Sequence, residues 1–218
     1  TNPEQIWTVS YGPCTRSPLN FYDECLQTAR IINEKTREPI HILFSGGIDS
    51  EVALQAFAHA KIPVTAAILR FKNDLNIHDI SWAVIACESL KIPYKFYDLD
   101  VLDFWRNSAW DYATATYCIS PQLLTTMWLI DQIKGYPVMG SGECLLVKEI
   151  PENYLPGVSP YEPSTWRLWE KEKIAAWYRH FIFRHREGCP GFFQYTPEIM
   201  LSYLQDPLVK DLVANKLT

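Results

Sequence analysis

The spacing of apolar residues changes abruptly between residues 40 and 60. Residues 40–44 read I-H-I-L-F, an apolar run too short for a helix, and Pro39 disfavours helical backbone just before it. This run predicts a buried parallel strand. After S-G-G, the apolar residues recur on one side of a helix, which predicts a helix over residues 48–60. Strand, glycine turn and helix form the unit around which the chain is organised.

The same alternation continues along the chain. Further strands are predicted at 62–71, 92–99 and 136–139, and helices at 20–35, 79–90 and from Pro121 to Gly135. Residues 101–119 are aromatic and unpatterned, which is typical of an active-site flap or a short broken helix. Strands alternating with helices predict an α/β fold in which helices wrap a parallel sheet, with every strand's carboxyl end on one edge.

The last third of the chain has a different pattern. Residues 150–163 contain four prolines, which indicates an extended connection. A helix is then predicted from Ser164 or Thr165 to Gly188, and a last helix from Thr196 to just before Pro207. We therefore expect an N-terminal arm over residues 1–19, an α/β domain over 20–149 and a helical region over 150–218 that packs on the same domain.

Composition and charge limit the classes of protein to which this chain can belong. The net charge of −5 and the pI near 5.5 disfavour a protein that coats nucleic acid, without excluding a local basic patch. No apolar run approaches the length of a membrane span, and residues 1–10 lack the layout of a secretory signal. The six cysteines form no C-x-x-C pair, so we expect buried thiols in a cytoplasmic protein. Eight tryptophans point to a lined pocket or an interface, which leaves a homo-oligomer open.

The turn after the first strand combines the features of an anion site. Gly46 and Gly47 permit left-handed backbone and close approach, Ser45 and Ser50 add hydroxyl donors, and the helix N-terminus adds partial positive charge. The carboxylate of Asp49 suits a phosphate only if a divalent cation lies between them, which predicts a magnesium-nucleotide. The alternative is a tight turn whose Ser and Asp residues simply cap a helix.

The sequence S-G-G-I-D-S resembles the pyrophosphate-binding loop of the PP-loop ATP pyrophosphatases at all six positions, directly after a strand. The Walker pattern, by contrast, is absent. The resemblance implies a Rossmann-like PP-loop (HUP) fold, ATP and Mg²⁺ as cofactors, and Asp49 as a metal ligand. It also implies that the adenine lies against the backbone at the end of the second strand, at Leu69.

A second motif follows the fourth strand. Ser141, Gly142 and Glu143 resemble the S-G-E triplet of the asparagine synthetases and β-lactam synthetases, so within the superfamily the motifs are closest to the asparagine synthetase domain. The chain then reads C-L-L-V-K-E where that family has an acidic pair. The resemblance implies that Glu143 acts near the adenylated intermediate and can bind metal. Charge builds on the α-phosphate during adenylation, so cations are needed there, and Lys148, Arg70 and Lys72 are candidates by placement.

Two charged groups lie outside these motifs. The acidic run contains Asp98, Asp100 and Asp103, and the late helix has a positive end over residues 179–186. Both are expected from helix capping and the helix dipole, although metal, substrate or RNA phosphate remain alternatives.

The resemblance implies an AMP-forming ligase. It activates the carboxylate or carbonyl of a small-molecule acceptor with ATP, releases pyrophosphate, and lets an amine or ammonia displace AMP. The nitrogen donor is free or comes from a partner protein. Three alternatives remain open: a sulfonucleotide reductase with Cys189 as its reactive thiol, a PP-loop enzyme that modifies tRNA or a nucleobase, and a nucleotide-binding interaction module without chemistry.

Overall fold

The fold is a four-stranded parallel sheet between two layers of helices, in a computed structural model that describes residues 12–142, 145–148, 166–169 and 173–209. The strand order is β3-β2-β1-β4, and every pairing is parallel. The α/β prediction is confirmed, and the second and third strands start slightly later than predicted. The strands are β1 (Ile40–Leu43), β2 (Thr65–Phe71), β3 (Tyr94–Leu99) and β4 (Tyr136–Met139).

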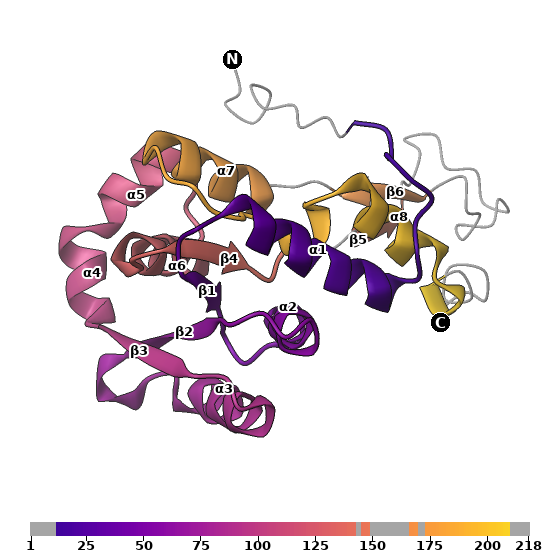
Figure 1. Cartoon of the computed structure of the whole chain (residues 1–218). Helices are drawn as coiled ribbons and strands as arrows, with labels where there is room; N and C mark the ends of the chain where they lie inside the picture. Colours follow the sequence, from indigo (N-terminus) through magenta and orange to yellow (C-terminus); the bar gives the residue numbers. More distant parts are fainter. Residues whose placement is uncertain (1–11, 143–144, 149–165, 170–172, 210–218) are drawn as a thin grey trace, which may run out of the picture.

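Helices cover both faces of the sheet (Figure 1). One core lies between the sheet and α1, α2 and α3, and a second lies between the sheet and α4 to α7. Among the helices of the described residues, none is long and apolar enough to cross a membrane. The helices are α1 (Phe21–Lys35), α2 (Ile48–His59), α3 (Ile77–Leu90), α4 (Val101–Asn107), α5 (Ala109–Thr116), α6 (Pro121–Gln132), α7 (Lys173–Phe183) and α8 (Pro197–Gln205), with short 3₁₀ turns η2 (Lys72–Asp74) and η4 (Phe192–Gln194).

Strand β2 shows how one segment serves both cores. Ala66 and Ile68 face the core that contains α2 and α3, whereas Ala67 and Leu69 face the core that contains α6. Successive side chains of a strand point to opposite faces, so a strand buried on both faces must be apolar throughout. This requirement explains the continuous apolar runs in the sequence.

The order of the strands reverses between β1 and β4. The chain builds β1, β2 and β3 in one direction, then passes through α4, α5 and α6 and returns to pair β4 with the other side of β1. Ligands of open α/β sheets bind in the crevice at such a reversal, outside the carboxyl ends of the strands. The loop after β1 and the turn after β4 both lie at this point.

Two predictions on irregular segments have clear outcomes. Residues 101–116 form the helices α4 and α5, which matches the prediction of a broken helix. The predicted helix from Ser164 or Thr165 is wrong in its first part, because Trp166–Trp169 form strand β6, antiparallel to β5 (Leu145–Lys148), and α7 begins only at Lys173. The two tryptophans fit helical spacing, but pairing with a distant segment decides their structure.

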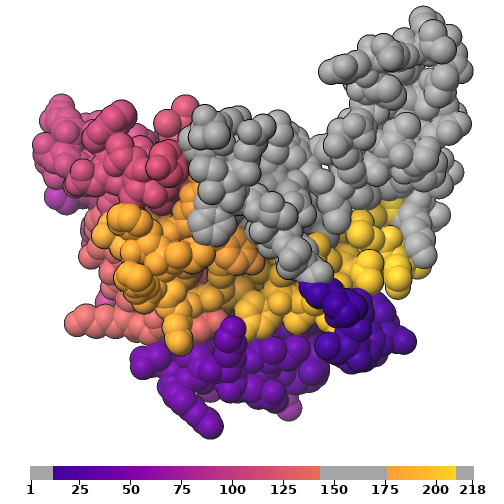
Figure 2. Space-filling view, turned by 90° about the horizontal axis from the view of Figure 1, so that it is seen from above, coloured from indigo at the N-terminus to yellow at the C-terminus, as the bar shows by residue number. Residues whose placement is uncertain are grey.

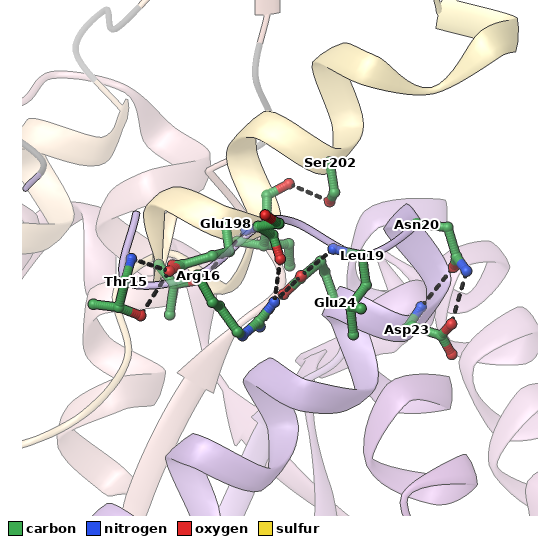
Figure 3. Close-up of polar contacts among 11 residues, drawn as sticks. Thr15, Arg16, Leu19, Asn20, Asp23, Glu24, Glu198 and Ser202 are labelled. Atoms are coloured by element: carbon green, nitrogen blue, oxygen red, sulfur yellow. Dashed lines mark hydrogen bonds and ion pairs between the residues drawn. The ribbon is translucent and has the colours of Figure 1, made fainter. Parts of the chain in front are cut away.

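The segment before α1 is fastened to two helices (Figure 3). Arg16 donates to Glu24 of α1 at 2.7 Å, and the hydroxyl of Thr15 donates to Glu198 of α8 at 2.8 Å. Leu19 N–H donates to the same Glu24 at 2.7 Å. These bonds satisfy the buried carboxylates of Glu24 and Glu198, and they hold the segment over the side of the domain where α1 and α8 meet.

In Figure 2, α8 (yellow) and the α4–α5 pair (pink) lie at opposite ends, with α7 (orange) between them.

Candidate active site

The loop from β1 to α2 leaves the first turn of α2 open to ligands. Gly47 occupies the N-cap position and has no side chain that could close the turn. The first helical hydrogen bond runs from Glu51 N–H to Gly47 O at 3.0 Å, so the N–H groups of residues 48–50 precede the regular helical pattern. Such N–H groups, with the partial positive charge of the helix end, are suited to an anion.

Two serine hydroxyls hold the loop in shape from inside. Ser50 is buried, and its hydroxyl donates to Gly47 O at 2.9 Å. Its oxygen lies 3.2 Å from the Ser45 hydroxyl, which in turn accepts from Gly47 N–H at 3.3 Å. The loop is therefore preorganised by its own residues, and an incoming anion does not have to order it.

Two glycines let neighbouring backbones approach this loop. Gly46 has φ +82°, and a Cβ there would lie 2.5 Å from Asp79 O in the first turn of α3. A Cβ on Gly140, at the end of β4, would lie 2.4 Å from Ser50 Cα. Both distances are too short for any side chain. The sequence therefore has glycine where α3 and β4 pack on the loop.

A cleft of about 510 Å³ opens over the carboxyl ends of the strands. It is lined by most of the predicted cofactor-binding residues: Ser45, Gly47, Asp49, Ser50 and Leu69. Gly46 lies behind the loop, against α3. Further residues that no sequence motif marks also line the cleft, namely Asn76, Asp79, Trp105, Gln122, Thr125, Thr126 and Trp177. Several of them come from α6, whose N-terminal end reaches the cleft through Pro121 and Gln122.

The backbone at the end of β2 forms one wall of this cleft. Leu69 O accepts from Asn76 Nδ2 at 2.9 Å, and Phe71 N–H donates to Asn76 Oδ1 at 2.8 Å. A carbonyl oxygen has two lone pairs, so Leu69 O can still accept a second hydrogen bond. A nucleobase could therefore pair with this peptide edge, as the resemblance implies.

Asp49 is the predicted magnesium ligand of this loop. Its carboxylate is exposed in the first turn of α2 and lines the cleft. Within the described residues, no group of three or more His, Cys, Asp or Glu side chains could hold a metal. A single carboxylate nevertheless suits Mg²⁺, which proteins usually bind through one or two carboxylates together with substrate phosphates and water.

Arg70 lies outside the described lining of this cleft. Its guanidinium donates to both oxygens of Asp98 on β3, with one distance of 2.9 Å, and stacks over the Phe96 ring with its carbon 4.5 Å from the ring centre. This arginine lowers the pKa of Asp98 below its ordinary value through the hydrogen bond. Lys72 is likewise 3.4 Å from Asp100. Any role of Arg70 at the α-phosphate stays a prediction that requires this pair to open.

Two of the predicted catalytic residues cannot be placed. Glu143 lies outside the described residues, and for Lys148 the structure gives only its backbone position in β5, opposite Trp166. The turn before Glu143 is described. Ser141 lines the cleft, and its hydroxyl donates to Pro190 O at 3.1 Å. The turn at Ser141 therefore lies beside the cleft.

The charged groups set aside in the sequence analysis have structural partners. Asp100 caps α4 by accepting from Asp103 N–H at 3.0 Å. At the end of α7, His180 and Arg184 contact Asp131 of α6 at 3.0 and 3.2 Å. Burial would raise the pKa of Asp131, but hydrogen bonds led by that from His180 lower it. Asp100 thus has the predicted capping role, and His180 and Arg184 are paired with a carboxylate of the protein itself.

Cys189, the candidate thiol of a reductase, is fully buried. Residue 189 pairs with Val138 beside β4, and burial raises the pKa of the thiol to about 12. A nucleophilic cysteine requires an accessible thiolate. The structure therefore disfavours the sulfonucleotide reductase alternative.

Comparison with known proteins adds little to this geometry. No protein-family model matches the chain, and no curated protein matches it. Among solved structures, it is similar to an NMN synthetase from Francisella tularensis, with 20% identity over 54% of this chain and 52% of that one and a TM-score of 0.40. It is also similar to an NH3-dependent NAD synthetase from Campylobacter jejuni, with 16% identity over 51% and 49% and a TM-score of 0.39. The chain spans about half the length of these two proteins, and at such scores neither likeness carries an argument.

Proposed function

We propose that this protein is an AMP-forming ligase of the PP-loop type, which activates the carboxylate or carbonyl oxygen of a small molecule with Mg-ATP. The observation that supports it most is the open first turn of α2 beside Asp49, at the reversal of strand order and inside a 510 Å³ cleft. The motif S-G-G-I-D-S occupies this turn. The N–H groups of residues 48–50 would hold the phosphates of the nucleotide, and Asp49 would hold a magnesium ion that offsets their charge.

The shape of the cleft suggests how the reaction would proceed. The end of β2, at Leu69, would take the base, and the α-phosphorus would then face the α6 side of the cleft. The acceptor oxygen attacks this phosphorus, an O–P bond forms, and the bond to pyrophosphate breaks. An amine or ammonia then attacks the activated carbon, and AMP leaves. Positioning these groups supplies much of the rate enhancement.

The roles of the remaining predicted residues are part of this proposal. Glu143 would orient or deprotonate the attacking amine, and Lys148 or Arg70 would offset the charge that builds on the α-phosphate. The S-G-E triplet favours amide formation of the asparagine synthetase kind.

Product analysis tests the proposal. Wild-type protein is incubated with Mg-ATP and a panel of small carboxylic acids, with and without ammonium, and the nucleotide products are separated. We expect AMP and pyrophosphate. Formation of ADP and phosphate would contradict it, and an absence of turnover across the panel despite tight ATP binding would favour an interaction module.

A further inference from the structure

The strand β2 extends beyond its neighbour β1 on the cleft side. Along a strand, the N–H and C=O groups of successive residues point to alternate neighbours. Ala66 N–H donates to Pro93 O on the β3 side, and Ala67 O accepts from Phe44 N–H on the β1 side, both at 2.9 Å. Residues 69 and 71 have the same parity as Ala67, so their backbone groups also point to the β1 side. Since β1 ends at Leu43, these groups extend over the cleft.

The side chain of Asn76 takes the place that a further β1 peptide would occupy. Its amide donates to Leu69 O at 2.9 Å and accepts from Phe71 N–H at 2.8 Å, the pattern of one more rung of the ladder. One carboxamide can satisfy both backbone groups only if its NH₂ group faces Leu69 O and its oxygen faces Phe71 N–H. The asparagine therefore fixes the peptide edge at the end of β2.

Asn76 stands where a helix cap is expected, yet its side chain does not cap α3. It is the N-cap residue of α3, and asparagine at this position normally accepts from the first turn. Here its amide is directed to β2 instead. The connecting turn also contains consecutive left-handed residues, Asn73 and Asp74, with φ of 62° and 56°. Such a turn persists only when its surroundings fix it, and the Asn76 bonds do so.

We propose that Asn76 is a positioning residue that sets the nucleobase preference of the cleft, an inference that rests on the proposed ATP-dependent function. With one lone pair of Leu69 O held by Asn76, Leu69 presents its backbone N–H donor beside the remaining lone pair of its carbonyl oxygen. Adenine offers the complement, the N1 acceptor beside the N6 amino donor. Guanine offers an N1–H donor beside the O6 acceptor, which opposes both groups. A site built to hydrogen-bond one base edge rejects the other strongly.

Calorimetry with Mg-ATP, Mg-GTP and magnesium pyrophosphate separates this role from a general structural one. Pyrophosphate has no base, so its affinity reports the loop at 45–50 alone. Wild type should prefer ATP to GTP. In Asn76→Ala we expect ATP affinity to fall about tenfold or more and the ATP/GTP ratio to fall by a similar factor, while pyrophosphate affinity stays within about twofold. Asn76→Asp keeps an acceptor for Phe71 N–H but cannot donate to Leu69 O, so it should lose the preference too.

The matched control is Asn107→Ala, because Asn107 also binds a neighbour through its amide, Asp103 Oδ1 at 2.8 Å, but lies at the end of α4. It should bind all three ligands as wild type does. A wild-type protein that binds neither ATP nor pyrophosphate would overturn the proposed function and this inference together. Wild type that binds ATP and GTP equally, or Asn76 variants that keep the wild-type ATP/GTP ratio, would overturn the role of Asn76 alone.

Discussion

Helices α2 and α8 begin in opposite ways. The first turn of α8 is closed by the Thr196 hydroxyl, which accepts from Ile199 N–H at 3.3 Å, and α1 is closed in the same way by Asn20. Helix α2 has Gly47 at its N-cap, which offers no capping side chain, and its first turn faces the cleft. Helices α1 and α8, which meet away from the cleft, thus have a side-chain cap, whereas α2 leaves its first N–H groups for a ligand. Changes at the cleft should therefore alter binding or turnover, and changes at α8 should alter only stability.

The largest expected effect is on turnover. Glu143→Gln keeps size and polarity but removes the base, so we expect the rate of product formation to fall about 10²-fold with ATP affinity nearly intact. Steady-state kinetics and calorimetry on the same preparation measure both. Turnover near the wild-type rate would show that Glu143 is only a turn residue.

Gly140 lies where the sheet packs against the loop of the cleft, so a change there should affect both stability and binding. In Gly140→Ala the new Cβ would lie 2.4 Å from Ser50 Cα, so β4 and α2 must move apart. Overpacking of this kind should lower the free energy of unfolding by about 2 kcal/mol and weaken ATP binding as well. Gly12→Ala is the control, since nothing lies within 4 Å of a Cβ there. Equal stability of the two variants in urea denaturation would contradict the close contact.

A smaller effect is expected on the supporting side. Thr196→Ala removes the cap of α8 and should lower the free energy of unfolding by about 1 kcal/mol, with unchanged ATP affinity. Thr196→Ser keeps the hydroxyl and should restore most of the loss. If Thr196→Ala instead weakened ATP binding at equal stability, the division between cleft and support would fail.

Local patterns in the sequence account for most of the sheet and for the loop. The glycine turn between a short apolar run and a helical pattern predicts β1, the loop at 45–50 and α2 with little error. The role of Asn76 could not be predicted, because it depends on β2 being longer than β1, a property of pairing between distant segments. Strand β6 was missed for a related reason: W-R-L-W becomes a strand only through its partner β5.

Arg70 is a second case in which pairing between distant segments decides what the sequence alone does not predict. Its position at the carboxyl end of the second strand made it a candidate for the phosphate. In the structure, however, the register of β2 against β3 sets Arg70 opposite Asp98. The sequence predicts at which edge of the sheet Arg70 lies, but not the direction in which this long side chain extends. That direction follows from a cross-strand partner.

The central claim is that the open turn at 45–50 binds Mg-ATP through its N–H groups and Asp49. Titration calorimetry of Mg-ATP into wild type and Asp49→Ala, each repeated with EDTA, tests it most directly. We predict that Asp49→Ala weakens binding more than about tenfold, or about 1.4 kcal/mol, and that EDTA weakens wild type but changes the variant little. Equal affinity of the two proteins in the presence of magnesium would contradict the claim.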